Sequence, residues 1–269
     1  MAADREHELG EQWQTSVHRS GSTVLRAAGP QSATVIRLLA HLDAHGFGAA
    51  PRPVGDGFAA DGREKLEYVE GRSPQPAPWT REAIGQIGHT LRRLHDIAAS
   101  FDPGPDPRWR ASFARDLPGA RPVLGHGDLG PWNIIAREGM TVAFIDWDNA
   151  GPVDALWELA QAGWLNAQLH DDDVAERNNL GSPAERIAQL VTFLDGYGLE
   201  RAARPALVDM MIEFAIRSAR EEAVVGRIGP DTPSPDLEGF PVLWAITWRT
   251  RAAAWMLDHR SQLLAALGA

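Results

Sequence analysis

Apolar residues follow two different spacings along this chain, with short strand-like runs before residue 70 and long helical stretches after it. Residues 22–26 form a β-branched run after a Ser-Gly turn, which predicts a strand. Helical spacing that begins at Ser32 or Thr34 and stops at Gly46 predicts a helix. Two further runs, joined by an Asp-Gly turn, predict a strand pair at residues 52–58 and 64–69. Together these elements make a small α+β unit.

Proline-rich residues 71–78 interrupt this pattern, so we divide the chain into residues 1–70 and residues 71–269. Beyond this boundary most apolar residues recur at helical spacing. The expected helices are 81–97, 155–168, 182–194, 204–225 and 241–267. Two short strands are expected between the first two helices, at residues 133–136 and 141–145. Residues 1–16 are polar, and we expect them to be frayed or loosely packed.

The composition is that of a soluble globular protein, with 44% hydrophobic and 23% charged residues. The chain has no cysteine, which excludes disulfides and thiolate metal sites and fits a cytoplasmic location. The net charge of -10 argues against nucleic acid as a partner. We also expect no association with a membrane, because the chain lacks a signal peptide and a run of roughly 18 apolar residues.

The candidate chemistry is concentrated between residues 125 and 152, in the stretch GHGDLGPWNIIAREGMTVAFIDWDNAGP. Phosphoryl transfer needs a carboxylate beside the acceptor hydroxyl and oxygen ligands that hold Mg²⁺ on the phosphates. Asp128 and Asn133 lie five residues apart, the spacing of the protein-kinase catalytic loop. Asp146 follows thirteen residues later, and a hairpin of that length would bring it back beside Asn133. Each residue alone could be an ordinary turn residue.

The motifs HGDLGPWNII and FIDWDNAGP resemble those of the aminoglycoside phosphotransferase family, and weaker similarity extends over most of the chain. This resemblance implies a two-lobed protein-kinase-like fold, with a small β-rich N-terminal lobe and a larger, mostly helical C-terminal lobe. It also implies site residues. Asp128 would be the catalytic base, His126 would organise its loop, Asn133 and Asp146 would hold Mg²⁺, and the backbone from Glu67 to Val69 would bind adenine.

The N-terminal part departs from the family pattern at three points. The family usually carries a lysine on the third strand, but the single lysine, Lys65, lies on the expected hinge strand. Arg26 is the positional candidate for binding the phosphates, although a guanidinium differs from an ammonium in shape. The expected helix from Ser32 to Gly46 has no glutamate to pair with it, and no Gly-x-Gly-x-x-Gly loop precedes the first strand.

Three functions are therefore considered. The first is a phosphotransferase that uses ATP or GTP with Mg²⁺ to phosphorylate a hydroxyl of a small polar molecule. The net charge favours a cationic acceptor, and the family resemblance implies an aminoglycoside-like one. The second is a nucleotide-binding protein of the same fold without turnover, suggested by the atypical N-terminal part. The third is a metal-dependent phosphoesterase, with a metal site made of His126, Asp128, Asp146 and Asp148.

Overall fold

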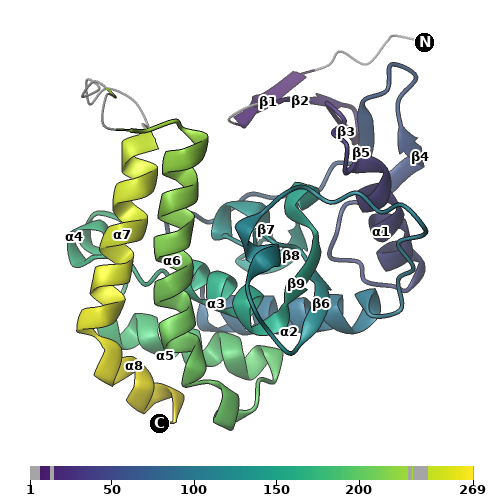
Figure 1. Cartoon of the computed structure of the whole chain (residues 1–269). Coiled ribbons are helices and arrows are strands. Elements are labelled where there is room, and N and C mark those ends of the chain that lie inside the picture. Colours follow the sequence, from purple (N-terminus) through teal and green to yellow (C-terminus); the bar gives the residue numbers. More distant parts are fainter. Residues whose placement is uncertain (1–6, 13–14, 230–231, 233–241, 269) are drawn as a thin grey trace.

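The computed structural model describes residues 7–12, 15–229, 232 and 242–268. The chain has a small sheet-rich N-terminal part and a larger helical C-terminal part, as the resemblance predicted (Figure 1). The N-terminal sheet lies at one end of the molecule, and helices α6 and α7 stand at the other (Figure 1). The division at residues 70 and 71 stays a prediction.

The N-terminal sheet has five strands in the order β1-β2-β3-β5-β4, and every neighbouring pair is antiparallel. Its strands are β1 (His7–Gln12), β2 (Thr15–Ser20), β3 (Thr23–Arg26), β4 (Pro53–Phe58) and β5 (Glu64–Glu67). Helix α1 (Ser32–Ala44) buries Val35, Leu38 and Leu39, and the turn after it contains Gly46. The predicted strands and helix are thus present, within a few residues at their ends.

The expectation that residues 1–16 are frayed is wrong for the part of this segment that the structure describes. His7–Gln12 and Thr15–Ser20 pair as strands, while residues 1–6 and 13–14 lie outside the described residues. Their sequence gave no strand signal because it is almost entirely polar. Backbone groups make the hydrogen bonds between strands, so a polar strand at the edge of a sheet can pair without an alternating apolar pattern.

The C-terminal part is mostly helical and contains two short strand pairs. Its helices are α2 (Arg81–Ala98), α3 (Ala155–Asn166), α4 (Asp172–Arg177), α5 (Pro183–Tyr197), α6 (Ala206–Val225), α7 (Val242–Asp258) and α8 (Arg260–Leu267). Helix α2 packs against α5 at very short range, since a Cβ on Gly88 would lie 2.1 Å from the backbone oxygen of Phe193. The predicted helix 241–267 is two helices that meet at His259, and residue 241 lies outside the described residues.

Two strand pairs carry the candidate chemistry. The first pair is β6 (Pro122–Gly125) with β9 (Gly151–Asp154), and the second is β7 (Ile134–Arg137) with β8 (Met140–Phe144). The second pair is the predicted hairpin. Strand β9 was not predicted, because its four residues include a glycine and a proline.

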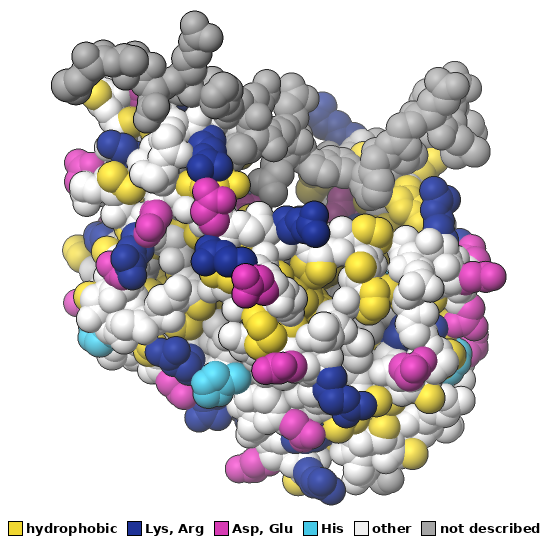
Figure 2. Space-filling model, turned by 180° about the vertical axis from the view of Figure 1, so that it is seen from behind, with side chains coloured by type: hydrophobic (Ala, Val, Ile, Leu, Met, Phe, Trp, Pro, Cys, Tyr) yellow, Lys and Arg dark blue, Asp and Glu magenta, His cyan; other side chains and the backbone are white. Residues whose placement is uncertain are grey.

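Charges of both signs are mixed on the face of the molecule in Figure 2. On the face in Figure 2, described Lys and Arg side chains are interspersed with Asp and Glu, so they form no continuous positive patch there. Among the described residues, none of the helices combines the length and hydropathy needed to cross a membrane.

Candidate active site

The loop from Gly125 to Asn133 makes a tight turn that depends on glycine. Strand β6 ends at Gly125, and a short 3₁₀ turn ending at Asn133 leads into β7. Gly127 has a φ of 76°, and a Cβ at this position would lie 2.2 Å from the backbone oxygen of Asn149. A side chain would therefore meet both backbone strain and a steric clash. This turn places Asp128 immediately after β6.

Asp128 is half-buried, and its two carboxylate oxygens face different amide side chains. Nδ2 of Asn133 donates to Oδ2 at 3.1 Å and to the backbone oxygen of Asp128 at 2.8 Å. Nε2 of Gln161 donates to Oδ1 at 3.4 Å. Burial and, next, the negative charge of Asp146 raise the pKa of Asp128 to about 6. Such a carboxylate is mostly ionised at neutral pH and is more basic than an exposed one.

His126 joins this loop to the end of β8. The side chain is fully buried, and its Nε2 donates to the backbone oxygen of Ile145 at 2.9 Å. A carbonyl can only accept, so Nε2 carries the ring proton. Nδ1 in turn accepts a long hydrogen bond of 3.4 Å from the backbone N–H of Asp128. Burial lowers the pKa of His126, which keeps the ring neutral.

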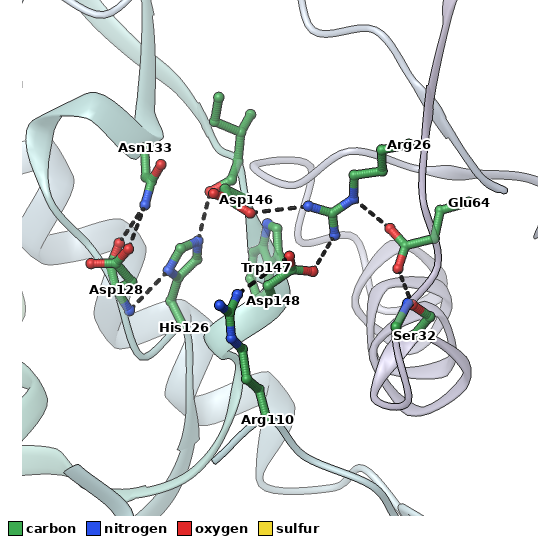
Figure 3. Close-up of polar contacts among 12 residues, drawn as sticks. Arg26, Ser32, Glu64, Arg110, His126, Asp128, Asn133, Asp146, Trp147 and Asp148 are labelled. Carbon is green, nitrogen blue, oxygen red and sulfur yellow. Dashed lines mark hydrogen bonds and ion pairs between the residues drawn. The ribbon is translucent and has the colours of Figure 1, made fainter. Parts of the chain in front are cut away.

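The β7–β8 hairpin brings Asp146 back beside Asn133, as the spacing predicted (Figure 3). The backbone N–H of Ile145 donates to the backbone oxygen of Asn133 at 2.8 Å. Asp146 itself has a φ of 61°, in the left-handed region that few residues other than glycine adopt. Its side chain is 27% exposed, so its carboxylate remains accessible to a ligand.

One polar atom at this point has no partner in the described part of the chain. Asn133 is only 1% exposed, and its Oδ1 accepts no hydrogen bond. A buried carbonyl oxygen without a partner is unfavourable, because it has lost its hydrogen bonds to water. Amide and carboxylate oxygens are the protein ligands that Mg²⁺ takes, so Asn133 and Asp146 fit such an ion.

Arg26 lies at the end of β3, where three carboxylates surround its guanidinium (Figure 3). Nε donates to Glu64 at 2.5 Å, Nη1 to Asp146 at 3.0 Å and Nη2 to Asp148 at 2.7 Å. Burial alone would lower the pKa of Arg26, but the charges of Asp148, Glu64 and Asp146 outweigh it and raise the pKa. Arg110 approaches the other oxygen of Asp148 at 3.7 Å. Arg26 thus connects the N-terminal sheet to the end of the β7–β8 hairpin.

The structure supplies a carboxylate partner that the sequence did not reveal. With no glutamate between Ser32 and Gly46, the ion pair of Arg26 was expected to be missing. Glu64 provides it from β5, where strand register places it directly opposite Arg26. Glu64 also accepts a hydrogen bond from the hydroxyl of Ser32 at the start of α1. The partner therefore comes from a neighbouring strand, and its position depends on a register that spacing alone does not give.

The two remaining candidates lie at and just beyond the end of β5. Glu67 is exposed, and its backbone N–H donates to the backbone oxygen of Arg52 at 2.8 Å. Val69 follows two residues later, beyond the strand. Glu64 occupies the opposite end of the same strand, so β5 connects these two residues to the ion pair of Arg26. Lys65 is half-buried in this strand.

Helix α3 supports the catalytic loop through three polar side chains that sequence analysis did not select. Glu158 accepts from the backbone N–H of Gly127 at 2.8 Å and binds His95 of α2 at 2.6 Å. Gln161 contacts Asp128, and Asn166 donates to the backbone oxygen of Leu129 at 2.8 Å. All three are buried. Three polar residues in an otherwise apolar helix were the available signal, because buried polar groups need partners.

Comparison with known proteins places the chain in a family. It matches the model of the phosphotransferase enzyme family over residues 12–121 and 106–207. It is also 53% identical over 253 residues to the trifolitoxin immunity protein of Rhizobium leguminosarum bv. trifolii, covering 94% of this chain and 95% of that protein.

Solved structures share the fold at low sequence identity. A choline/ethanolamine kinase family protein from Mesorhizobium loti superposes with a TM-score of 0.60 at 16% identity, covering 98% of this chain and 92% of that one. A thermostable mutant of aminoglycoside phosphotransferase APH(4)-Ia, in a ternary complex with ADP and hygromycin B, gives 0.56 at 14% identity, with coverage of 95% and 94%. These structures confirm the kinase-like fold. The match to the family model, which spans more than half of the sequence, shows that the chain belongs to the phosphotransferase enzyme family.

Proposed function

We propose that this protein transfers the γ-phosphoryl group of ATP or GTP to a hydroxyl of a small polar molecule. The observation that carries this proposal is the juxtaposition of Asp128, Asn133 and Asp146, together with Oδ1 of Asn133, which has no partner among the described residues. A carboxylate and a set of oxygen ligands at one point are the two requirements of phosphoryl transfer. Use of a nucleotide also fits a cytoplasmic protein.

Asp128 is the proposed catalytic base. Asn133 and Gln161 fix the orientation of its carboxylate. One carboxylate oxygen accepts the proton of the acceptor hydroxyl while the hydroxyl oxygen attacks the γ-phosphorus and the bond from that phosphorus to the nucleoside diphosphate breaks. His126 does not take part in proton transfer in this scheme, because its Nε2 proton is bound to Ile145. It holds the loop at a fixed distance from Asp146. Glu158 of helix α3 also holds this loop in place, because it accepts a hydrogen bond from the backbone of Gly127.

Asn133 and Asp146 are the proposed ligands of Mg²⁺. When bound, this ion would neutralise the charge that develops on the transferred phosphoryl group. Arg26 lies beside Asp146 and would add a positive charge near the phosphates, while the backbone of Glu67 and Val69 would bind the base. The same observations disfavour a metal-dependent phosphoesterase. His126 has no nitrogen that is free to bind a metal beside Asp146, since both ring nitrogens are hydrogen-bonded.

The relatives suggest what the acceptor does in the cell. The 53% identical relative is named for immunity to trifolitoxin, and the APH(4)-Ia structure contains hygromycin B. We infer that this protein protects its cell by phosphorylating a toxic small molecule. Phosphorylation adds up to two negative charges to one hydroxyl, which is enough to destroy a close fit between a toxin and its target.

The proposal is tested with the full chain, Mg²⁺ and either nucleotide, by following ADP or GDP release over a panel of hydroxyl compounds. Asp128→Asn should lower kcat by about 10²–10⁴-fold, because it removes the base. The variant should still be stabilised against heat by Mg-nucleotide, because Asn133 and Asp146 are unchanged. Asp258→Asn, at the exposed end of α7, is the matched control and should behave as wild type.

Two results would count against this assignment. Near-normal turnover by Asp128→Asn would exclude Asp128 as the base. Stabilisation by Mg-nucleotide without transfer to any acceptor, in the wild-type protein, would favour a nucleotide-binding protein without turnover.

A further inference from the structure

A cavity of about 410 Å³ lies between the ends of α2 and α5 and the start of α3, with strand β6 at its wall. Small-molecule sites combine an apolar wall with a few polar groups, and this cavity has that composition. Its apolar side chains are Ala99, Val123, Ala155, Leu156, Leu159 and Leu199. Among the described residues that line it, none is Asp128, Asn133 or Asp146. The cavity is therefore separate from the proposed active site.

Tyr197, at the end of α5, connects this cavity to the loop that carries Asp128. Its hydroxyl lies 2.8 Å from Nδ1 of His95, and Nε2 of His95 lies 2.6 Å from a carboxylate oxygen of Glu158. The other oxygen of Glu158 accepts the backbone N–H of Gly127 at 2.8 Å. Tyr197 and His95 line the cavity, whereas Glu158 is buried. A chain of three hydrogen bonds thus runs from the cavity to the residue before Asp128.

Two guanidinium groups line the cavity together with Tyr197 and have N–H groups to spare. The side chain of Arg121 is exposed and makes no hydrogen bond or ion pair with any residue that the structure describes. Arg92 lies over the ring of Tyr197, with 5.7 Å between its guanidinium carbon and the ring centre. Its pair with Asp96 uses only Nε. Such planar groups of donors match a carboxylate.

The hydroxyl of Tyr197 can serve as a further donor. Burial raises the pKa of Tyr197 to about 12, so the hydroxyl keeps its proton at neutral pH. The carboxylate of Glu158 can only accept, so Nε2 of His95 carries a proton. When Nδ1 carries one too, the oxygen of Tyr197 accepts it and the phenolic proton is left for a ligand. A bound carboxylate selects this arrangement, in which a charged His95 faces the carboxylate that holds Gly127.

Two carboxylates, Asp96 and Glu200, also line the cavity. Nε of Arg92 binds both oxygens of Asp96, at 2.8 Å and 3.0 Å, so the charge of Asp96 is matched. Glu200 is exposed, and water weakens its repulsion of a bound anion. Arg121 is exposed as well, but its charge acts on the hydroxyl of Tyr197, where it partly offsets the effect of burial on the pKa. An anion is therefore favoured next to Arg121 and Tyr197.

We propose that this cavity binds a small apolar carboxylate, and that its occupancy is transmitted through the three hydrogen bonds to the loop of Asp128. The charged end of the ligand lies between Arg121 and the hydroxyl of Tyr197. Its apolar body packs on the apolar wall, which includes Leu159 of α3. The cavity is then a regulatory site, because its ligand strengthens the ion pair that holds the catalytic loop.

The ligand class is tested by isothermal titration calorimetry of the full chain with benzoate, benzamide and benzylamine, in the absence of nucleotide and acceptor. These probes share one ring but are an anion, a neutral amide and a cation. We expect a Kd of about 1 mM for benzoate and binding at least about tenfold weaker for the other two. Acetate keeps the charge without the ring and should also bind at least about tenfold more weakly. Equal affinity for benzoate and benzamide, or a preference for benzylamine, would overturn the proposal.

The position of the ligand is tested by Arg121→Met, which removes a charge from an exposed side chain. The Kd of benzoate should rise at least about tenfold, while that of benzamide stays the same. Arg217→Met is the matched control, because Arg217 is half-exposed on α6 and does not line the cavity. Glu200→Gln should leave benzoate binding unchanged or make it tighter. Undiminished binding of benzoate to Arg121→Met would place the anion elsewhere and refute the site.

Hydrogen–deuterium exchange tests the transmission to the loop. Saturating benzoate should slow the exchange of the backbone amides in residues 125–133, where Glu158 binds the N–H of Gly127. Tyr197→Phe keeps the ring beside Arg92 and removes the hydroxyl, so saturating benzoate should no longer slow this exchange. Protection confined to α2, α3 and α5 in the wild-type protein, or the same loop protection in Tyr197→Phe, would refute the transmission. Because no nucleotide is present, the result does not depend on whether the protein transfers a phosphoryl group.

Discussion

Glu64 needs an ionic partner, because it is a carboxylate with only 1% exposure. Its charge is matched by Arg26 across the strand pair and by the hydroxyl of Ser32. A paired buried ion does not by itself make a protein stable, since desolvation offsets much of the attraction. Removing one partner is different, because it leaves the other charge buried and alone.

Replacement of Arg26 by methionine should therefore destabilise the protein by about 3 kcal/mol or more. Adding Glu64→Gln to Arg26→Met should recover much of this loss, because the amide is neutral and can still bind Ser32. Urea unfolding of wild type, the two single variants and the double variant gives the coupling free energy between Arg26 and Glu64. Arg19→Met breaks an ion pair with Glu70 that is largely exposed, so it should cost less than about 1 kcal/mol. Additive effects of Arg26→Met and Glu64→Gln would contradict this account.

At the scale of elements, the catalytic loop is positioned by helix α3 and by two glycines that leave room for it. A Cβ on Gly125 would lie 1.9 Å from a carboxylate oxygen of Glu158, the residue that binds the backbone of Gly127. The burial of Glu158 would raise its pKa, but hydrogen bonding to His95 and the charge of His95 lower it overall. Glu158 therefore stays charged and holds the loop against α3.

Gly127→Ala should cost about 3 kcal/mol or more and abolish transfer, because it combines a left-handed φ with a clash against the backbone of Asn149. Gly139→Ala is the matched control in the β7–β8 turn. Its φ of 79° is similar, but a Cβ there would meet nothing within 4 Å. It should cost only about 1 kcal/mol. Urea unfolding and ADP release measure both variants, and equal losses would show that the clash is unimportant.

The sequence was sufficient for elements that have a local signal. Apolar spacing predicted α1, α2, α3, α5 and α6, and the distance from Asn133 to Asp146 predicted the β7–β8 hairpin. It did not predict α4, and it merged α7 and α8 into one helix. Contacts between distant segments were not predictable in this way. The pairing of Arg26 with Glu64 depends on strand register, and the approach of Gln161 to Asp128 depends on helix packing. The spacing of residues along the sequence predicts neither of these two contacts.

At the scale of the whole molecule, one side chain joins the two parts of the fold at the site itself. Arg26 is held by Glu64 within the N-terminal sheet and by Asp146 and Asp148 in the C-terminal part. A Mg-nucleotide bound at Asp146 would meet this arginine, so its binding would be coupled to the contact between the two parts. Stabilisation by a ligand that binds only the folded state would be about 2.7 kcal/mol at a concentration 100 times its Kd.

The stability of the molecule should depend on pH through histidines that are kept neutral by burial. His170 lies between α3 and α4, where burial and then the charge of Arg186 lower its pKa to about 4. In the unfolded chain its pKa is roughly 6.5, so the unfolded state binds more protons between pH 4 and 6.5. Stability must then rise with pH through this window, by at most about 3 kcal/mol from His170.

His126 acts in the same direction, since burial also lowers its pKa. His170→Gln should therefore remove part of the pH dependence rather than all of it. The free energy of unfolding in urea, measured at several values between pH 4.5 and 7, should rise less steeply for this variant than for wild type. The lost contact of His170 with Trp248 shifts the whole curve by a constant amount, so the slope is the informative quantity. Parallel curves for the two proteins would show that His170 titrates alike in the folded and unfolded chains.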